Sequence, residues 1–562
     1  MAVARYVAET AGVTRRLTHL VLGWALAAAA LIAPAVPFLP APTPVAAVDA
    51  SVERLAGRDR YATAAAVSAR FFAPGVPVAF VATGTAFPDA LAAGPAAATL
   101  GGPVLLTART ALPEATRAEI ARLRPNRIVV VGGPGTVSDA VMGALTAYHG
   151  GGGVQRLAGP DRFATAAAVS AATFAPAAPL VYVATGRNYP DALSGGVLAG
   201  RNRAPLLLVE TNAIPAATLA ELRRLAPRRI AILGGPSVVS SAVVAALDTL
   251  DTGDGVVRLA GADRYATSAV IASVQAAPSA GLFIATGRDF PDALAATPAA
   301  VAAGAPLLLV PGSSVPSTVL QQAKRLAPAR LVILGSPAVV TDRVTFSTRV
   351  AIGDLAPLPA CTYEDRATAH DGYDEWQRTT LDTVFRLGTG YHPADLVDTS
   401  RAGLNSGYPV RQHVVADLAA MAAAARNAGA PLAVRSAFRS YASQAATFQY
   451  WVDRVGYAQA LLTSARAGHS EHQLGTTFDF GSAGSGAPWD GVDWATTAAG
   501  AWMMANAWRY GFLMSYPKGT QPVTCYSYEP WHYRYFGREQ AASIRASGLT
   551  SREWVWMRND GS

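Results

Sequence analysis

Apolar and polar positions follow two patterns along the first two thirds of the chain. Short, almost continuously apolar runs are separated by longer segments in which apolar residues recur every three or four positions. Between residues 51 and 150 the apolar runs lie at 78–82, 103–106 and 127–131, and the periodic segments lie at 60–71, 89–100 and 113–123. Strands that are apolar on both faces and alternate with helices are typical of a parallel sheet covered on both sides. The pattern therefore predicts an α/β fold.

The same pattern occurs three times. A word of the form Arg-Leu-Ala-Gly-x-Asp-Arg begins at positions 54, 156 and 258, and each copy continues with Pro-Asp-Ala-Leu and ends on a strand-like run closed by glycine. A fixed period marks repeated structural units, and a period of about 100 residues is the size of a domain rather than of a solenoid turn. We expect three repeats, at 51–152, 153–254 and 255–351.

Several repeated residues have a structural interpretation. The aspartates of the Pro-Asp-Ala-Leu words are Asp89, Asp191 and Asp292, and an acid in this position favours a helix N-terminus. Neighbouring pairs such as Asp59 and Arg60 are expected to form ion pairs; the alternative is a set of arginines facing an anionic polymer. No glycine-rich phosphate-binding motif accompanies the closing glycines, which we interpret as strand-to-helix turns.

Two helix starts are predicted from single residues. Pro113 suits the first position of the helix at 113–123, because its missing N–H is one that a helix start leaves unpaired anyway. Ser138 suits the N-cap of a following helix, because its hydroxyl can accept a hydrogen bond from a free backbone N–H.

The first 47 residues have the parts of an export signal. Arg15 and Arg16 precede an apolar run at 20–33, and Val-Ala-Ala at 45–47 suits a cleavage site. The apolar run is shorter than the roughly 20 residues that a bilayer span requires. We expect a signal peptide at 1–47, with a retained N-terminal anchor as the alternative. No other segment is long and apolar enough to span, so the mature chain is expected to be soluble, exported and without a membrane span.

The formal net charge of the chain is +8 at pH 7. An exported basic protein suits anionic partners, such as cell-wall polymers that carry phosphate or carboxylate groups. The alternative is that the excess charge only keeps the protein in solution. No run of lysine or arginine is interleaved with aromatic residues, so we expect no nucleic-acid partner.

The two cysteines, Cys361 and Cys525, both lie in the last third of the chain. In an exported protein an even number of cysteines favours disulfide formation. We expect one disulfide that links the beginning of the C-terminal domain to the segment before its last motif. The alternative is that Cys525 is a metal ligand.

The repeat pattern ends near residue 350, and a proline-rich linker at 352–360 leads into a region rich in tryptophan, tyrosine and histidine. Three short words of this region carry candidate chemistry: Ser-Ala-Phe-Arg-Ser at 436–440, Ser-Glu-His-Gln-Leu-Gly-Thr-Thr-Phe-Asp at 470–479 and Glu-Pro-Trp-His at 529–532. Two imidazoles and a carboxylate suit zinc and leave a fourth position for water. A further acid can accept a proton from that water, and an arginine can stabilise an oxyanion. These words indicate a metallopeptidase.

Local spacing supports a shared site. Residues 477–480 alternate as a short strand, which places Thr477 and Asp479 on one face. Pro530 stiffens the last word, so that Glu529 and His532 are expected to face one pocket. Trp531 is expected to form an apolar wall of that pocket.

The three repeats resemble the type 2 cell-wall-binding repeat, which occurs in threes in exported proteins of Gram-positive bacteria. The resemblance covers about residues 51–350 and is carried by the Arg-Leu-Ala-Gly-x-Asp-Arg and Pro-Asp-Ala-Leu words. It implies a Rossmann-like fold with a parallel sheet for each repeat, and a pseudo-three-fold module formed by the three. It also implies non-covalent attachment to anionic cell-wall polymers.

The C-terminal region resembles the D-alanyl-D-alanine carboxypeptidases of the VanY type, within the LAS family of zinc peptidases that act on peptidoglycan. The family words S-x-x-R-S, S-x-H-x-x-G-x-A-x-D and E-x-W-H occur in order. The resemblance implies an α+β peptidase domain at 375–562, preceded by a linker and leading segment at 352–374. It also implies a ligand set for Zn²⁺ and two catalytic residues. The ligands are His472, Asp479 and His532, the general base is Glu529, and the residue that stabilises the oxyanion is Arg439.

Further roles follow from the same resemblance. Ser470 and Gln444 become candidates for holding the substrate. Thr477 replaces the alanine that is usual in the family, which places a hydroxyl beside the site and can narrow the pocket. Cys525 stands where glycine is common, which suits the expected disulfide better than a catalytic role.

We therefore expect a secreted, cell-wall-associated zinc carboxypeptidase that removes the terminal D-alanine from peptidoglycan stem peptides. The repeats would hold the enzyme near its immobile substrate and so raise the local enzyme concentration. One alternative is a peptidoglycan endopeptidase of the same zinc family. The other is a wall-binding surface protein whose peptidase domain is inactive.

Overall fold

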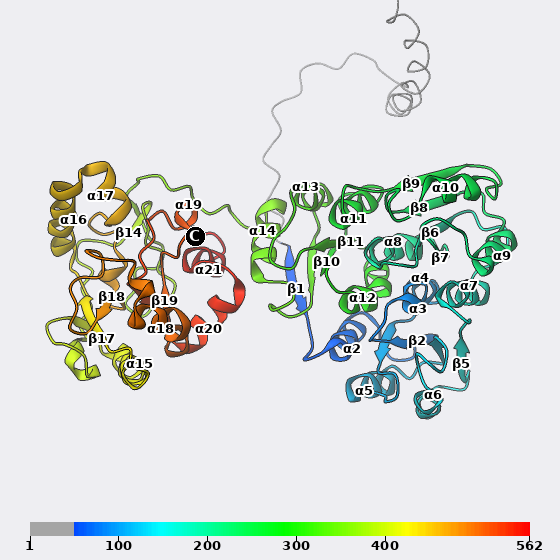
Figure 1. The fold of residues 1–562 in the computed structure, drawn as a ribbon, viewed down its shortest axis with the longest axis horizontal. Coiled ribbons are helices and arrows are strands. Elements are labelled where there is room, and N and C mark those ends of the chain that lie inside the picture. The colour runs from blue at the N-terminus through cyan, green and yellow to red at the C-terminus, as the bar shows by residue number, and fades with distance from the viewer. Residues whose placement is uncertain (1–49) are drawn as a thin grey trace, which may run out of the picture. The chain divides into compact units, whose positions relative to one another are not determined.

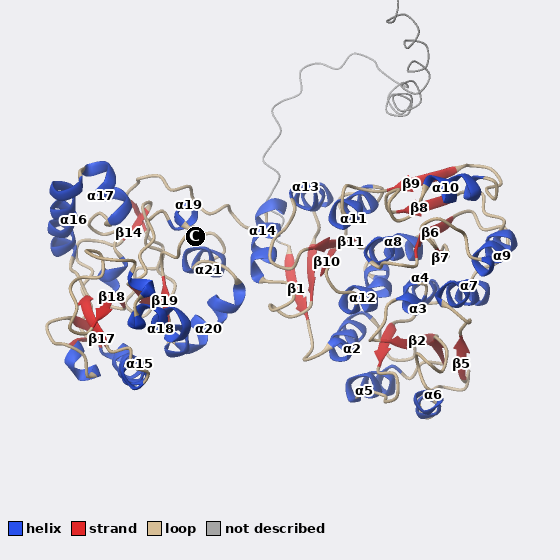
Figure 2. Ribbon diagram, viewed as in Figure 1, coloured by secondary structure: helices blue, strands red, loops and turns tan. Residues whose placement is uncertain are grey.

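The structure is a computed structural model that describes residues 50–562, and the expected signal peptide at 1–47 lies outside the described residues. Figure 1 follows the chain through three α/β repeats and into a C-terminal domain, and Figure 2 separates their helices from their strands. Within the described part of the chain, no helix is both long and apolar enough to cross a membrane.

Each repeat alternates strands and helices in the order that the apolar pattern predicts. Repeat 1 contains β1 (Ser51–Leu55), α2 (Arg60–Phe71), β2 (Val78–Thr83), α3 (Pro88–Leu91), α4 (Ala93–Thr99), β3 (Val104–Thr107), α5 (Glu114–Leu123), β4 (Arg127–Val131) and α6 (Asp139–Leu145). Repeat 2 contains β5 (Val154–Leu157), α7 (Arg162–Thr173), β6 (Val181–Thr185), α8 (Pro190–Arg201), β7 (Leu206–Val209), α9 (Ala216–Leu225), β8 (Ile230–Leu233) and α10 (Ser241–Asp248). Repeat 3 contains β9 (Val256–Leu259), α11 (Arg264–Ser273), β10 (Leu282–Thr286), α12 (Pro291–Ala302), β11 (Leu307–Val310), α13 (Ser317–Leu326), β12 (Arg330–Leu334) and α14 (Asp342–Ile352).

The repeats form three four-stranded parallel sheets, and each sheet borrows one strand from another repeat. The sheet orders are β3-β2-β4-β5, β7-β6-β8-β9 and β11-β10-β12-β1. The first strand of repeat 2 thus completes the sheet of repeat 1, and the first strand of repeat 3 completes that of repeat 2. Strand β1 closes the series by pairing with β12, from Ser51 opposite Arg330 to Leu55 opposite Leu334. The three repeats are therefore joined by backbone hydrogen bonds as well as by side chains.

One helix from each repeat contributes to a shared apolar core. Helices α4, α8 and α12 pack against one another, and the largest buried cluster contains residues of all three repeats (Figure 1). Small side chains allow this close packing, because a Cβ added to Gly94 would come within 2.8 Å of Thr297. The core explains why the helix that follows the second strand is rich in alanine and glycine.

The closing glycine of each repeat makes room for the repeated aspartate. Gly132 and Gly335 have φ values of +108° and +94°, and a Cβ added there would come within 2.9 and 2.7 Å of the Oδ2 atoms of Asp89 and Asp292. Both the positive φ and the close approach require glycine. The interpretation of the closing glycines as strand-to-helix turns is confirmed.

The expected ion pair between Asp59 and Arg60 is wrong. The Asp59 carboxylate caps α2, accepting hydrogen bonds from the backbone N–H groups of Tyr61 and Ala62 at 3.0 and 2.8 Å. Arg60 points elsewhere and donates from Nη1 to the carbonyl oxygen of Gly84 at 2.6 Å. The same contacts recur in the other two repeats. A side chain at the N-cap turns back onto its own helix, and it is then no longer directed at the next residue.

The two predicted helix starts have different outcomes. Ser138 is the N-cap of α6, and its hydroxyl accepts a hydrogen bond from the N–H of Val141 at 3.3 Å, as predicted. Pro113 lies one position earlier than predicted, because its ψ of 147° is extended and the helix begins at Glu114. Proline fixes φ but leaves ψ free, so it suits the N-cap as well as the first turn.

The C-terminal domain is built on an antiparallel sheet of order β17-β18-β20-β19. Its elements are β13 (Arg366–Ala367), β14 (Phe385–Arg386), β15 (Leu396–Asp398), β16 (Pro409–Arg411), α15 (Val415–Asn427), β17 (Leu432–Ser436), α16 (Tyr441–Val455), α17 (Tyr457–Thr463), β18 (Thr477–Ser482), α18 (Ala498–Asn506), β19 (Phe512–Met514), α19 (Gln521–Thr524), β20 (His532–Tyr535), α20 (Arg538–Ser547) and α21 (Ser551–Arg558), with a short 3₁₀ helix, η3, at Glu471–Leu474. Phe478, Phe480 and Phe512 join an apolar cluster on this sheet with residues of α15 and α18. The apolar cluster holds the central strands rigid where they carry the polar motif residues.

A disulfide joins Cys361 to Cys525, with Cα atoms 5.2 Å apart. The prediction of one disulfide is confirmed, and the alternative that Cys525 is a metal ligand is wrong. The bond ties the leading segment to the end of α19, shortly before the Glu-Pro-Trp-His word.

Candidate active site

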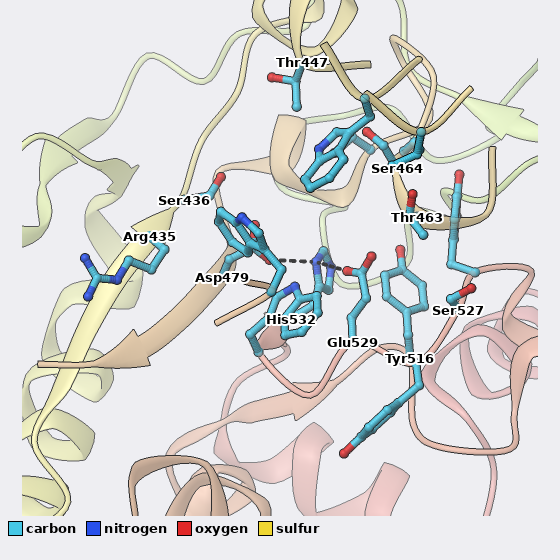
Figure 3. Close-up of a pocket in the computed structure, with 18 of the residues that line it drawn as sticks. Arg435, Ser436, Thr447, Thr463, Ser464, Asp479, Tyr516, Ser527, Glu529 and His532 are labelled. Carbon is cyan, nitrogen blue, oxygen red and sulfur yellow. Dashed lines mark hydrogen bonds and ion pairs between the residues drawn. The ribbon is translucent and has the colours of Figure 1, made fainter. Parts of the chain in front are cut away.

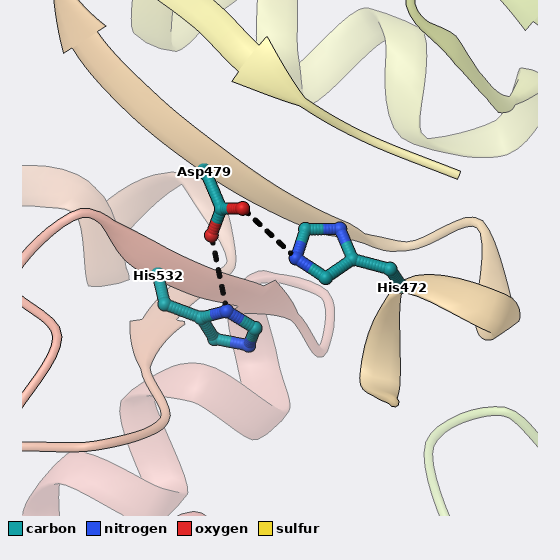
Figure 4. Close-up of side chains that lie close together, drawn as sticks. All are labelled: His472, Asp479 and His532. Atoms are coloured by element: carbon teal, nitrogen blue, oxygen red, sulfur yellow. Dashed lines mark hydrogen bonds and ion pairs between the residues drawn. The ribbon is translucent and has the colours of Figure 1, made fainter. Parts of the chain in front are cut away.

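Three motif residues converge from three elements of the C-terminal domain. His472 lies in η3, Asp479 in the middle of β18, and His532 at the start of β20. The antiparallel register places Asp479 directly opposite His532. Gly475, with a φ of +72°, ends η3 and turns the chain from His472 into β18. One donor atom from each of the three lies within 4.8 Å of the other two (Figure 4).

The two imidazoles present different nitrogens to the same carboxylate. His472 Nε2 lies 3.2 Å from Asp479 Oδ2, and His532 Nδ1 lies 3.1 Å from Asp479 Oδ1. The ring planes are nearly perpendicular, at 86°. His472 Nδ1 lies 2.7 Å from the carbonyl oxygen of Ala437, to which it donates. That hydrogen bond leaves a lone pair on Nε2, which is the nitrogen that faces the cluster.

These three residues fit a metal ion. His472 is fully buried, and among the described residues its Nε2 has no hydrogen-bond partner of acceptable geometry although it faces Asp479. A buried polar atom without a partner is costly unless something else satisfies it. Two nitrogens and a carboxylate oxygen are the donors that zinc takes in catalytic sites with an open position.

Glu529 and Arg439 flank the cluster on its open side. Glu529 Oε2 lies 3.6 Å from His532 Nδ1, and Arg439 Nη1 lies 3.6 Å from Asp479 Oδ2. Arg439 is held in place by its own hydrogen bonds, from Nη1 to Ser436 Oγ at 2.6 Å and from Nε to Gln444 Oε1 at 2.7 Å. An acid and a guanidinium therefore face the same space as the three donors.

That space is a cavity of about 540 Å³ (Figure 3). Asp479, His532, Glu529 and Arg439 line one end of it. Trp531 forms part of the wall, as predicted, and the aromatic lining residues are Tyr450, Trp451, Trp489, Tyr516, Tyr526, Tyr528 and Trp531. A volume of this size suits a small peptide rather than a single ion.

Comparisons with known proteins agree with this arrangement. Residues 408–538 match the family described as D-alanyl-D-alanine carboxypeptidase, VanY. Residues 54–142, 156–244 and 258–345 each match cell wall binding domain 2. The C-terminal domain belongs to the VanY family. The chain thus joins three cell-wall-binding repeats to a C-terminal VanY domain.

Individual relatives cover parts of the chain. The putative carboxypeptidase YodJ of Bacillus subtilis is 35% identical over 175 residues, which are 30% of this chain and 63% of that protein. A D-alanyl-D-alanine carboxypeptidase of Enterococcus faecium is 30% identical over 122 residues, which are 22% of this chain and 35% of that protein. The matches thus span less than two thirds of either relative. The structure of Cwp8 from Clostridium difficile has a TM-score of 0.50 and 27% identity, and the match covers 54% of this chain and 52% of that one.

The pKa values of the two clustered histidines shift in opposite directions. Burial, together with the positive charge of Arg439, lowers the pKa of His472 to about 4. Burial also disfavours the charge on His532, but hydrogen bonds to Asp479 and Glu471 outweigh it and raise its pKa to about 10. For Asp479 burial would raise the pKa, yet the two histidines hold it well below its usual range. The carboxylate thus stays charged, which a metal ligand requires.

Glu529 behaves in the opposite way to Asp479. Burial raises its pKa to about 8, and the charge of Asp479 adds to the effect while His532 and Arg439 oppose it. A carboxyl group whose pKa lies near neutral pH can both accept and return a proton. This property separates Glu529 from the other acids of the site.

The structure places the two predicted substrate-holding residues differently. Ser470 lines the cavity, and its hydroxyl accepts a hydrogen bond from the N–H of His472 at 3.3 Å. Gln444 is fully buried behind Arg439 and is not among the lining residues. Its Oε1 accepts from Arg439, and its Nε2 donates to the carbonyl oxygen of Ala465 at 2.6 Å. Both ends of its amide are thus occupied by the protein itself.

Sequence reasoning missed Glu471, which lies next to His472 in the chain. Glu471 is 5% exposed and its Oε2 lies 3.0 Å from His532 Nε2. The only signal was its place inside the Ser-Glu-His word, and a charged residue beside a motif histidine is usually solvated. Nothing in the sequence indicated that it would turn toward the other histidine.

Proposed function

We propose that the protein is an exported zinc D-alanyl-D-alanine carboxypeptidase that hydrolyses the terminal D-alanine of peptidoglycan stem peptides. One observation carries the proposal: His472, Asp479 and His532 share a buried cluster whose open side is flanked by Glu529 and Arg439 at the end of a peptide-sized cavity. Membership of the VanY family supports the reaction type. The substrate itself is inferred from the resemblance.

His472, Asp479 and His532 would hold the metal ion through Nε2, a carboxylate oxygen and Nδ1 respectively. When bound, zinc lowers the pKa of water and polarises a carbonyl group. The three donors suit zinc because they offer nitrogen and oxygen and leave a position open.

Glu529 is the general base and then the general acid. Its carboxylate takes a proton from the water that attacks the carbonyl carbon of the scissile peptide bond. As the C–N bond breaks, Glu529 returns that proton to the amine of the departing D-alanine. A pKa raised by burial to about 8 suits both transfers, because the proton is neither held nor released too strongly.

Arg439 donates to the carbonyl oxygen as negative charge develops on it. Its hydrogen bonds to Ser436 and Gln444 fix the guanidinium before the substrate arrives, so little reorganisation is needed in the transition state. The aromatic walls of the cavity, including Trp531 and Tyr516, displace water and strengthen these electrostatic interactions.

We also propose that the repeats form a pseudo-three-fold module of Rossmann-like units. Three aromatic residues at equivalent positions, Phe87, Tyr189 and Phe290, contact one another with centroids 5.3 to 5.8 Å apart. Each ring also lies about 6 Å from an arginine of the repeat that follows it in the series, as Arg162 does over Phe87. The cyclic order of these contacts and the exchange of first strands support the symmetry.

The proposed role of this module is attachment of the exported enzyme to anionic polymers of the cell wall, so that the enzyme acts as a secreted, wall-associated protein. The match to cell wall binding domain 2 and the positive net charge of the chain support this role. Attachment would keep the VanY domain near a substrate that does not diffuse.

The catalytic proposal is tested with the purified protein, a stem pentapeptide that ends in D-Ala-D-Ala, and cross-linked peptidoglycan. Release of free D-alanine that stops on addition of a chelator and returns with zinc is the expected result. Cleavage of cross-links without release of D-alanine would instead support an endopeptidase. Absence of any zinc-dependent product would indicate a wall-binding protein with an inactive peptidase domain.

Attachment is tested with the full-length Glu529→Gln variant, so that hydrolysis does not alter the walls. We expect it to sediment with intact walls and to remain in solution with walls stripped of anionic polymers. Equal binding to both preparations would contradict the proposal.

A further inference from the structure

Glu471 is a buried acid that the proposed reaction does not use. It belongs to the Ser-Glu-His word and is adjacent to His472, but its side chain is directed at the other histidine. Only 5% of the residue is exposed. A buried carboxylate requires partners, and its partners show what it stabilises.

Three donors surround the Glu471 carboxylate. Oε2 accepts from Ser515 Oγ at 2.6 Å and lies 3.0 Å from His532 Nε2. Oε1 accepts from Arg534 Nη1 at 3.0 Å. Arg534 is fixed in turn, because its Nη2 donates to the backbone carbonyl oxygens of Trp376 and Thr379 at 2.5 and 2.9 Å. Donors to both oxygens therefore fix the position of the Glu471 carboxylate.

The opposite edge of the His532 ring faces the proposed ligand cluster. Its Nδ1 lies 3.1 Å from Asp479 Oδ1, so the two nitrogens of one ring contact two different acids. A neutral imidazole carries one proton, and the hydrogen bond made by one nitrogen decides which nitrogen has the free lone pair. An acceptor at Nε2 therefore leaves the lone pair on Nδ1.

We propose that Glu471 is a positioning residue that accepts the Nε2 proton of His532 and so directs the Nδ1 lone pair toward the metal. The proposal rests on the metal site of the proposed function. Partners of this kind fix the orientation of a ligating histidine and raise its basicity, and their loss typically weakens metal binding about 10- to 100-fold.

A carboxylate is needed because all three neighbours are donors. An ionised glutamate accepts from His532, Ser515 and Arg534 at once, whereas a glutamine has one oxygen and one NH₂ group. If the oxygen of a glutamine turns to Arg534, its NH₂ group faces His532 Nε2. That arrangement draws the lone pair to Nε2 and places the proton on Nδ1, where the metal is proposed to bind.

The test is the zinc affinity of Glu471→Gln in the full-length protein, measured by competition with a chromogenic chelator. We expect the dissociation constant to rise about 10- to 100-fold relative to the native protein. The difference in Tm between zinc-loaded and metal-free protein should shrink in parallel. The visible absorption of the cobalt-substituted variant, which reports ligand geometry, should differ from that of the native protein.

Glu221→Gln is the matched control. Glu221 has the same exposure of 5% and is also held by a serine and an arginine, Ser170 at 2.5 Å and Arg224 at 2.7 Å, but it contacts no histidine. Its loss should change the stability of repeat 2 and leave the zinc affinity unchanged. The pair therefore separates loss of a buried acid from loss of the hydrogen bond to a ligand.

The outcomes distinguish this inference from the proposed function. A native protein without zinc affinity would overturn both. Native zinc binding with an equal affinity in Glu471→Gln would overturn the role of Glu471 alone. If Glu471→Gln does not fold, Glu471→Asp takes its place, because the shorter carboxylate cannot reach His532 and Arg534 together; unchanged zinc affinity in that variant would likewise overturn the inference.

Discussion

The repeats and the VanY domain both bury carboxyl groups, and they surround those groups differently. Asp191 and Asp292 lie in the first turns of α8 and α12, where burial raises the pKa of each to about 6. In the VanY domain Asp479 is 5% exposed, yet His472 and His532 hold its pKa well below the usual range. Burial alone favours the neutral acid, and cationic or hydrogen-bonding neighbours reverse that preference.

The difference matters for chemistry. An acid that is half neutral near pH 6 can support packing and turn geometry but is a poor metal ligand. An acid that stays ionised among imidazoles can bind a cation. Glu529 combines the two environments, because burial raises its pKa to about 8 although it lies near His532 and Arg439. Its surroundings, rather than its residue type, suit it to proton transfer.

The sheets of the repeats and of the VanY domain also differ in where they place polar side chains. The inner strands of the repeats are buried on both faces, as the uniformly buried β2 and β6 illustrate. The antiparallel sheet of the VanY domain packs Phe478 and Phe480 into its core while Asp479, between them, faces the cavity. Alternation along β18 thus supplies a rigid apolar side and a reactive side within one strand.

The largest expected effect is that of Glu529→Gln. Loss of the proposed general base should lower kcat about a thousandfold, within the range of 10² to 10⁴ for such groups. Zinc affinity and Tm should stay close to native, because Glu529 is not among the proposed ligands. Hydrolysis of the pentapeptide and zinc titration measure the two properties. Asp292→Asn, which changes a buried acid of the repeats, should leave kcat unchanged. A large loss of kcat in this variant would contradict the distinction between the buried acids of the repeats and those of the VanY domain.

Arg439→Ala is expected to lower kcat by about a hundredfold or more while zinc remains bound. Removing one donor to a developing oxyanion typically costs about 2.7–4 kcal/mol of transition-state stabilisation. Steady-state kinetics should show the loss in kcat rather than in KM. Arg538→Ala removes a guanidinium that pairs with Asp417 on the domain surface, and its kinetics should remain native. A near-native rate for Arg439→Ala would remove this residue from its proposed role.

Replacing Cys361 and Cys525 together by alanine should destabilise the VanY domain by about 5 kcal/mol, since the disulfide closes a loop between residues 164 positions apart. Calorimetry of the full-length protein should show a lower unfolding temperature for that domain and an unchanged one for the repeats. Reduced unfolding temperatures for both would show that the two regions unfold as one unit.

Asp191→Asn should have the smallest effect, and the size of that effect depends on pH. The folded-state pKa of about 6 lies above the ordinary value of 3.8, so the folded protein binds more protons than the unfolded one between these values. The stability of the module therefore falls as pH rises from about 4 to above 6. The asparagine variant should remove this loss and be more stable by about 1–2 kcal/mol at pH 7.5, with little change at pH 4. Chemical denaturation at both pH values measures this difference in stability. An equal difference at pH 4 and pH 7.5 would contradict the raised pKa of Asp191.

Much of the fold follows from local pattern. Continuous apolar runs marked the inner strands, and the second and fourth strands begin where they were predicted, at Val78 and Arg127. The helix after β1 has its predicted limits, Arg60–Phe71. The pairing of β1 with β12 was not predictable, because strand partners some 280 residues apart leave no mark in either strand.

For the site, the sequence by itself determined which residues are present, and the family resemblance of the words that contain His472, Asp479 and His532 predicted that these three act together. Only the tertiary structure decided that Arg60 donates to Gly84, that Gln444 supports Arg439, and that Glu471 contacts His532. The physical reason is that hydrogen bonds depend on the direction of a side chain. That direction is set by packing against elements distant in the chain, which residue type and spacing do not encode.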